Sequence, residues 1–209
     1  MTKVTFNDIL KAREAIRPYV RQTPLEQSFF LGDEKHRFFF KLESLQRARS
    51  FKIRGAVNKM LSLTEEERLR GVAAVSSGNH GSSVAYAAQL LGIEKAVIIV
   101  PECTPQSKIE KIRYFGGEVH LMGRNYDEAH AQGMAYILQH GLTNIDSCHD
   151  DILVYAGQGT VALEILEQEP EIDTIVVPIW LVFRFFLSCS TSSLSCQTIS
   201  RKYFRSGTK

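Results

Sequence analysis

The chain has 209 residues, of which 44% are hydrophobic and 23% are charged, and its formal net charge is +2. This length allows one domain with a substantial core or two small ones. The small net charge does not favour a nucleic-acid partner, and no apolar run is long enough to cross a bilayer, so we expect no nucleic-acid partner and no membrane. Residues 1–20 carry charges throughout, which is not typical of a signal peptide.

The positive charge is concentrated at the C-terminal end. Residues 180–209 contain five Lys or Arg and no acidic residue, which leaves 20 basic and 23 acidic residues in the rest of the chain. The four cysteines show neither CxxC nor zinc-ligand spacing (Cys103, Cys148, Cys189, Cys196). We therefore expect reduced thiols, a cytoplasmic location and no metal ligands among them. Cys148-His149-Asp150 is contiguous, and adjacent side chains rarely converge, so we expect it in a loop.

The N-terminal part predicts a helix followed by extended segments. Apolar residues recur at helical spacing from Phe6 to Val20, with Thr5 or Asn7 as the candidate N-cap residue. Thr23-Pro24-Leu25 is expected to be extended, because proline disfavours helix in the residue before it. The apolar run Phe38–Leu42 is typical of a strand.

From Ile53 onward, helical patterns alternate with short apolar strands. The expected helices cover 53–63, a short segment capped by Thr64, 81–91, 105–115, 126–140 and 159–168, and the expected strands cover 72–75, 96–100, 119–122 and 174–179. This alternation predicts an α/β fold with a parallel sheet covered by helices on both faces. Glu164 and Glu167 are expected on a solvated helix face, as are Tyr126-Asp127-Glu128.

Lys52 lies where a strand-like run gives way to a helix-like stretch, between Phe51 and Ile53. A lysine held against apolar neighbours loses hydration, which lowers its pKa, and a neutral lysine amine is a nucleophile toward carbonyl groups. Spacing alone favours an ordinary solvated lysine at a helix start, because catalytic lysines are rare.

Three segments give Lys52 a more specific interpretation. They are Glu43–Ala56 around Lys52, Ser76–Gly81, and Ala156–Thr160. In this order and spacing they resemble the threonine/serine dehydratase and serine racemase group of fold-type II pyridoxal-phosphate (PLP) enzymes, and the likeness extends from about Ile9 to Ile179. Any one of these short motifs would be a weak signal, but three in register are a strong one.

The resemblance implies a tryptophan synthase β-like α/β fold with two parallel-sheet domains, of which the larger is incomplete in this chain. Residues 53–146 would form the small domain, residues 1–52 and 147–179 would form part of the large domain, and residues 180–209 would be a divergent tail. The cofactor would lie in the cleft between the two domains. Full-length relatives would be homo-oligomers.

The resemblance also implies PLP as cofactor and dehydration of L-threonine or L-serine to a 2-oxo acid and ammonia. Lys52 would hold the PLP aldehyde as a Schiff base and, once displaced by the substrate amine, would remove the α-proton. Phe51 and Asn79 would also contact the cofactor, with Asn79 at its 3-hydroxyl. The substrate carboxylate would bind at a helix N-terminus, where free N–H groups favour anions. Its pocket would be lined by Ser76, Gly78, Asn79 and His80.

Ser77 leaves a second reaction open. In the racemases the matching serine is the second catalytic acid/base, so its presence allows serine racemisation, although a helix-cap hydroxyl is the simpler role. A third alternative is a catalytically inactive remnant or interaction fragment. Gly157, Gly159 and Thr160 are expected to be structural, forming a tight turn into a helix with Thr160 near its cap. Likewise, the simpler reading of Ser76–Gly81 is polar capping with a surface histidine.

Two departures from the group affect these expectations. Ala48-Arg49 stands where the group usually has Thr-Gly, and a large side chain at position 49 would crowd the pocket or point to solvent. After Ile179 the group has a run of glycines whose N–H groups cradle the phosphate, whereas this chain has Trp180–Phe186. We therefore expect a strand at 174–179 without neighbours, weak or absent PLP binding, poor solubility and little or no turnover.

A reading-frame shift is one hypothesis for the divergent tail. Permitted codons for Lys202–Lys209, read one base later, encode Asn-Ile-Phe-Gly-Val-Glu-Pro, which resembles the next strand of the group. The rival hypothesis is a genuine C-terminal extension, for example an amphipathic segment that lies on a membrane surface. The nucleotide sequence separates the two, because a gene without the required codons excludes the shift.

Overall fold

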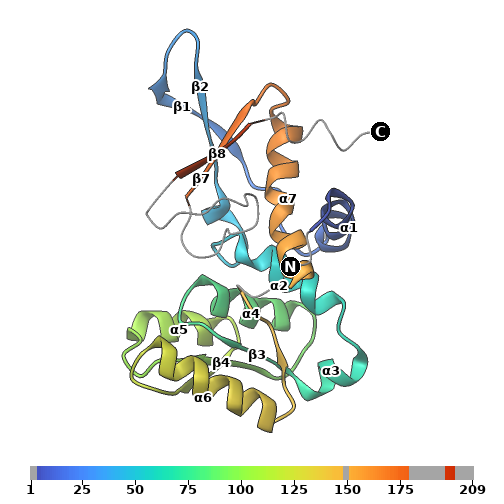
Figure 1. The fold of residues 1–209 in the computed structure, drawn as a ribbon, viewed down its shortest axis with the longest axis vertical. Coiled ribbons are helices and arrows are strands. Elements are labelled where there is room, and N and C mark those ends of the chain that lie inside the picture. Colours follow the sequence, from blue (N-terminus) through green and yellow to red (C-terminus); the bar gives the residue numbers. More distant parts are fainter. Residues whose placement is uncertain (1–3, 148–150, 179–195, 201–209) are drawn as a thin grey trace.

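The computed structural model describes residues 4–147, 151–178 and 196–200, so Cys148-His149-Asp150 and Trp180–Phe186 lie outside the described residues. The helices are α1 (Phe6–Ile16), α2 (Lys52–Leu61), α3 (Glu65–Arg70), α4 (Asn79–Leu90), α5 (Gln106–Tyr114), α6 (Tyr126–Gln139) and α7 (Ile152–Gln168), with a 3-10 turn η1 (Glu43–Leu45). The strands are β1 (Leu25–Gly32), β2 (Arg37–Lys41), β3 (Val72–Val75), β4 (Ala96–Val100), β5 (Glu118–Leu121), β6 (Thr143–Asn144), β7 (Thr174–Pro178) and β8 (Cys196–Ser200). Figure 1 shows their arrangement.

A four-stranded parallel sheet in the order β5-β4-β3-β6 forms the core that the sequence predicts (Figure 1). Side chains alternate between its faces, as the period of a strand requires. Val72 and Ala74 pack in a cluster with buried residues of α2, α4 and α5, whereas Ala73 packs on the other face with Ile137 of α6. The expected α/β sheet with helices on both faces is therefore confirmed.

Local capping signals set where two helices begin. Thr5 forms a reciprocal capping box with Asp8 at the start of α1, and Thr64 forms one with Glu67 at the start of α3. Thr5 rather than Asn7 is thus the N-cap residue of α1. This helix ends at Ile16, before the predicted end at Val20, because Pro18 lacks an N–H and its ring does not fit a helix interior.

The other strands form antiparallel pairs, which differ from the second parallel sheet implied by the resemblance. β1 pairs with β2 across a short turn in which the Asp33 carboxylate accepts the N–H groups of Lys35 and His36. Such a short connection can join only antiparallel strands. β7 pairs with β8 from Thr174↔Ser200 to Pro178↔Cys196, so the prediction that this strand has no neighbour is wrong.

Helix α7 begins earlier than the sequence predicts, and Gly157 and Gly159 lie inside it instead of in a tight turn. Asp151 caps the helix by accepting the N–H groups of Leu153 and Val154. A Cβ atom on Gly157 would lie 2.5 Å from the carbonyl oxygen of Arg54 in α2. The glycine is therefore needed for close packing of α7 on α2, which signals from the local sequence do not reveal.

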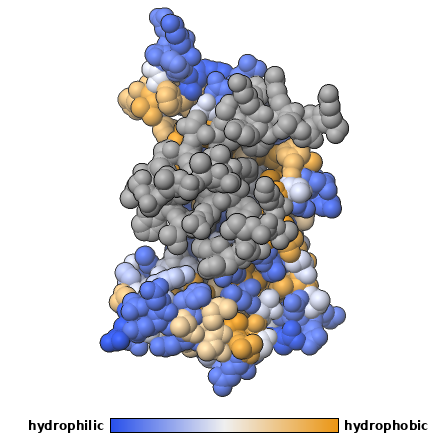
Figure 2. Space-filling model, in the orientation of Figure 1, coloured by the Kyte–Doolittle hydropathy of each residue, from blue (hydrophilic) through white to orange (hydrophobic). Residues whose placement is uncertain are grey.

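The β1–β2 hairpin exposes apolar side chains. Phe29 and Phe30 of the β1–β2 hairpin are each 95% exposed, and hydrophobic residues gather over this hairpin in Figure 2. In the part of the chain that the structure describes, no helix combines the length and hydrophobicity of a membrane span.

Candidate active site

Lys52 is the first residue of α2 and is only 6% exposed. Its amide N–H donates to Ser50 Oγ at 3.3 Å, and its ammonium nitrogen lies 5.3 Å from the centre of the Phe51 ring. This burial confirms that Lys52 is held at a strand-to-helix junction among largely buried neighbours, and it excludes an ordinary solvated lysine.

Ser76–Gly81 forms the connection from β3 into α4. Gly78 is the N-cap residue, and its N–H donates to Ser76 Oγ at 3.3 Å. A Cβ atom on Gly81 would overlap the carbonyl oxygen of Ser76, so this turn requires glycine there. Ser77 is half-buried in the same turn. The first N–H groups of α4 emerge at this point, as they do at the start of any helix.

His80 is buried rather than on the surface, with 4% of its area exposed. Its Nε2 lies 2.7 Å from the carbonyl oxygen of Ile145. A carbonyl only accepts hydrogen bonds, so Nε2 carries the proton and Nδ1 is an acceptor. Within the described residues, Nδ1 has no hydrogen-bond partner. A buried acceptor of this kind suits a donor group on a ligand, whereas a carboxylate would be met by backbone N–H groups.

The environment also keeps His80 neutral. Its pKa is lowered to about 4, mainly by burial and in smaller part by the nearby Lys52 charge, which together outweigh the opposite effects of the Ile145 carbonyl and Asp146. The electrostatic effect of Lys52 on His80 shows that the fold brings the first two sequence motifs together.

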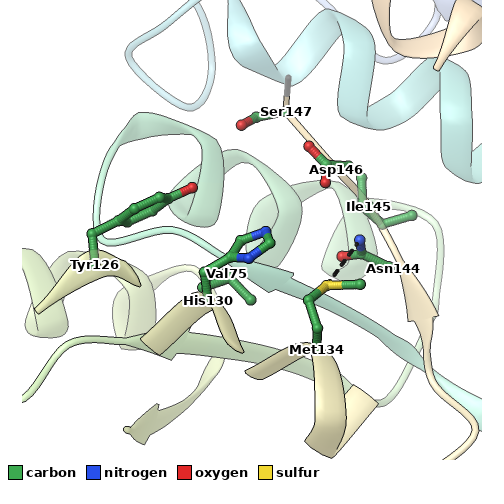
Figure 3. Close-up of a pocket in the computed structure, with 8 residues that line it drawn as sticks. All are labelled: Val75, Tyr126, His130, Met134, Asn144, Ile145, Asp146 and Ser147. Carbon is green, nitrogen blue, oxygen red and sulfur yellow. Dashed lines mark hydrogen bonds between the residues drawn. The ribbon is translucent and has the colours of Figure 1, made fainter. Parts of the chain in front are cut away.

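A small recess adjoins this site at the carboxyl end of β3 and β6. Figure 3 shows the polar ends of Tyr126, His130, Asp146 and Ser147 around it, and Asn144 Nδ2 donates to Met134 Sδ at 3.6 Å. Its volume of about 10 Å³ corresponds to roughly one water-sized group. Within the described segments, no group of three or more His, Cys, Asp or Glu is arranged to hold a metal ion.

A buried ionic cluster lies behind the start of α2, and we call it the Arg54 cluster (Lys41, Glu43, Arg54, Glu164). Arg54 is fully buried and donates twice to each of Glu43 and Glu164, at 2.6–2.9 Å. Lys41 Nζ donates to Glu164 Oε2, to Gln168 Oε1 and to the carbonyl oxygen of Thr23, each at 2.7 Å. Two cations and two carboxylates therefore neutralise one another across β2, η1, α2 and α7.

The prediction that Glu164 lies on a solvated helix face is wrong, because Glu164 is 8% exposed and belongs to this cluster. Burial raises its pKa, but the hydrogen bonds and charges of Arg54 and Lys41 outweigh that effect, and the pKa is lowered overall. Burial disfavours the Arg54 charge too, yet the hydrogen bonds to Glu43 and Glu164 raise its pKa overall. Arg54 and Glu164 therefore stay charged at neutral pH.

Arg49 and Lys111 lie near one another, and Lys111 contacts Asn79. Arg49 has a φ of 60°, in the left-handed region, which explains physically why glycine suits this position. Lys111 on α5 donates from Nζ to Asn79 Oδ1 at 3.1 Å. Desolvation lowers the pKa of Lys111, and the nearby charge of Arg49 lowers it further.

The structure thus brings Lys52 and Phe51 together with the turn that carries Ser76, Ser77, Gly78, Asn79 and His80. The sequence prediction did not include Lys111 or the Arg54 cluster. Arg54 and Glu164 are 110 residues apart in the chain, so no local pattern could pair them. The one available signal was an arginine two positions after Lys52 in an otherwise apolar helix start.

Comparisons with known proteins agree with this geometry. Residues 16–180 match the family described as "Pyridoxal-phosphate dependent enzyme". The chain is 40% identical over 178 residues to the L-threonine dehydratase catabolic TdcB of Staphylococcus aureus (strain USA300), a match that covers 84% of this chain and 51% of the relative. The chain therefore spans about half the length of the curated relatives it matches.

Solved structures give the same result. Maize serine racemase superposes with a TM-score of 0.77 at 37% identity, over 82% of this chain and 52% of the racemase chain. The processed form of threonine deaminase isoform 2 from Solanum lycopersicum superposes with a TM-score of 0.74 at 36% identity, over 82% of this chain and 48% of the deaminase chain.

Proposed function

This chain belongs to the pyridoxal-phosphate dependent enzyme family, with the α/β fold of its fold-type II members, and from that premise we propose that it dehydrates L-threonine or L-serine to a 2-oxo acid and ammonia. The observation that carries the proposal is the buried Lys52 at the start of α2, electrostatically coupled to the neutral His80. The similarity to a threonine dehydratase supports the reaction class.

The described residues fit one end of PLP. Lys52 offers a buried primary amine for the aldehyde, and Asn79 offers an amide for the ring hydroxyl. His80 Nδ1, a buried acceptor without a partner among the described residues, is available to a donor on the bound molecule. The residues after Pro178, where the related group has its phosphate-binding glycines, lie outside the described residues. We therefore retain the expectation of weak PLP binding.

When bound, PLP supplies an electron-accepting ring that stabilises negative charge at the α-carbon of an amino acid. Lys52 would hold the cofactor through its amine and, once free, would take the proton from that α-carbon. The N–H groups at the start of α4 hold the substrate carboxylate. His80 accepts a hydrogen bond from a donor on the ligand and, being neutral, adds no charge beside Lys52. These roles are supported by the burial of Lys52 and His80 and by the hydrogen bond from His80 Nε2 to the Ile145 carbonyl.

Serine racemisation is the second candidate, because Ser77 lies in the same turn as Asn79 and His80. A hydroxyl there would exchange a proton with the α-carbon on the face opposite Lys52. An assay with L-serine distinguishes the two reactions, because dehydration gives a 2-oxo acid and racemisation gives D-serine. An inactive chain would give neither product.

We also propose a cytoplasmic location and, for full-length relatives, assembly into homo-oligomers, as the sequence led us to expect. The division into a small domain at 53–146 and a partial large domain at 1–52 and 147–179 is part of the same proposal. Hinge motion between the two bodies on ligand binding would support this division, and small-angle scattering with and without ligand would measure it.

The proposed function is tested by titrating the protein with PLP and following the visible absorption spectrum, with Lys52→Ala as the matched variant. We expect a band at high PLP concentration that borohydride removes and that Lys52→Ala lacks. Threonine added before reduction should then yield 2-oxo acid and ammonia slowly, because weak PLP binding leaves little of the protein loaded. The same band in Lys52→Ala, or a lysine-dependent band with no product from threonine or serine, would contradict the proposal.

A further inference from the structure

Lys111 makes a directional contact with the candidate cofactor site. Its Nζ lies 3.1 Å from Asn79 Oδ1, and the two residues come from different elements, α5 and the start of α4. An ammonium group has three donors and no acceptor, so only the oxygen of the Asn79 amide can face it. The amide nitrogen of Asn79, with its two N–H donors, must therefore point away from Lys111.

The surroundings of Lys111 favour this arrangement over alternative contacts. In the described part of the chain, Lys111 forms no ion pair with a carboxylate. Arg49 adds a second positive charge near Lys111, and in such surroundings the acceptor oxygen of the Asn79 amide is favoured over its N–H donors. An asparagine amide has two orientations of similar shape, and a fixed donor on one side selects one of them.

We infer that Lys111 is a positioning residue for cofactor binding. By holding Asn79 Oδ1, Lys111 keeps the Asn79 N–H groups turned toward the cofactor, where they donate to the oxygen of its 3-hydroxyl group. This inference rests on the proposed function, because it assumes that Asn79 contacts the cofactor. A structural role alone would be small, since a partly exposed hydrogen bond from lysine adds little to stability.

The inference is tested by a double-mutant cycle on the dissociation constant for PLP, measured by absorption titration. Lys111→Met should weaken PLP binding by about fivefold, the effect expected when one hydrogen bond loses its alignment. Asn79→Ala should weaken binding at least as much. In the Asn79→Ala background, Lys111→Met should have no further effect, because Lys111 acts through Asn79.

Two further variants separate positioning from charge. Lys111→Arg keeps a donor-only cation and should restore most of the affinity lost in Lys111→Met. Lys108→Met makes the same substitution at an exposed position one turn earlier on α5 and should leave the dissociation constant unchanged. The inference would be overturned if Lys108→Met and Lys111→Met changed the dissociation constant for PLP equally. Additive effects of Lys111→Met and Asn79→Ala on that constant would also overturn it.

A measurement without PLP keeps this inference distinct from the proposed function. The side-chain amide protons of Asn79 give NMR signals whose shifts and exchange rates report the contact with Lys111. Lys111→Met should move these signals and speed their exchange, whereas Lys108→Met should not. Unchanged Asn79 signals would overturn the inference even if PLP binds Lys52, and absence of PLP binding with shifted signals would count against the proposed function alone.

Discussion

Lys41 and Lys52 are both largely buried, Lys52 at the start of α2 and Lys41 in the Arg54 cluster, and their surroundings differ. The side chain of Lys41 is 7% exposed, and its three ammonium donors meet Glu164, Gln168 and the Thr23 carbonyl at 2.7 Å. Lys52 is 6% exposed as a residue, and its described neighbours include the Phe51 ring and the neutral His80.

The difference separates two uses of buried charge. In the Arg54 cluster each cation meets a carboxylate, so the charges are balanced and hold β2, η1, α2 and α7 in one geometry. Such clusters give specificity of arrangement more than net stability. Beside Lys52, the buried His80 Nδ1 has no hydrogen-bond partner among the described residues. Incomplete pairing of this kind is typical of a site that completes its bonds with a ligand.

The largest expected effect comes from removing the Arg54 charge at the centre of the Arg54 cluster. Arg54→Met should lower the free energy of unfolding by about 3–5 kcal/mol, because Glu43 and Glu164 then stay buried without the guanidinium. Urea unfolding measures the loss. Arg113→Met, on the exposed side of α5, is the control and should change stability by less than about 0.5 kcal/mol. A loss below about 1 kcal/mol for Arg54→Met would mean that the cluster is not structural.

The second test is the pH dependence of stability that arises from His80, the neighbour of Lys52. The pKa of His80 is about 4 in the folded protein and near 6.5 in the unfolded chain, so between these values the unfolded state binds more protons. Stability should therefore be complete above pH 6.5 and fall by about 3 kcal/mol as the pH drops to 4. The measurement is urea unfolding across this range. His80→Gln, which keeps an N–H donor but does not titrate, should lose most of this dependence, and an equal dependence in the variant would contradict the assignment.

Gly157 and Gly159 of α7 test whether this helix needs its close packing on α2. Gly157→Ala should cost about 1–3 kcal/mol, because the new methyl group meets the Arg54 backbone in the adjacent helix. Gly159→Ala is the matched control, since its methyl group meets only the Ile9 side chain at 3.0 Å or more and alanine favours helix. Thermal unfolding of both variants should rank Gly157→Ala clearly below Gly159→Ala. Equal stabilities would show that α2 and α7 do not need this close approach.

The smallest expected effect on stability is that of replacing Arg49. Arg49→Gly should raise stability by about 1 kcal/mol, because φ at this residue lies in the left-handed region that glycine adopts without strain. The same substitution at Arg47, which is not in that region, should lower stability. Chemical denaturation of the two variants provides the comparison. A destabilised Arg49→Gly would mean that the arginine side chain makes a contact worth more than the backbone strain.

The sequence predicted β3, β4 and β5 of the parallel sheet, because each is a short segment bounded by glycine, proline or polar residues. It did not predict β6, which consists of two polar residues. The bounds of Val72–Val75 and Ala96–Val100 agree with the structure residue for residue. The sequence also indicated Lys52 and the Ser76–Gly81 turn, through a resemblance carried by contiguous motifs. It missed β1 of the hairpin, whose strand pattern is interrupted by polar residues, and it placed Gly157 in a turn.

What the sequence could not predict depends on contacts between distant segments. Glu164 is one of several acidic residues near the end of α7, and only its approach to Arg54 and Lys41, each more than 100 positions away, distinguishes it from the others. The same holds for Lys111, whose contact with Asn79 joins two elements 32 positions apart. The protonated nitrogen of His80 likewise became assignable only when the Ile145 carbonyl was located beside it.

The most direct test of the difference between the two buried lysines is to locate the pyridoxyl group after the protein is incubated with PLP, reduced with borohydride and digested for mass spectrometry. The account predicts that Lys52 carries most of the label and that Lys41, held by Glu164 and Gln168, carries none. A label on Lys41, or one spread over exposed lysines such as Lys35 and Lys95 with none on Lys52, would contradict it.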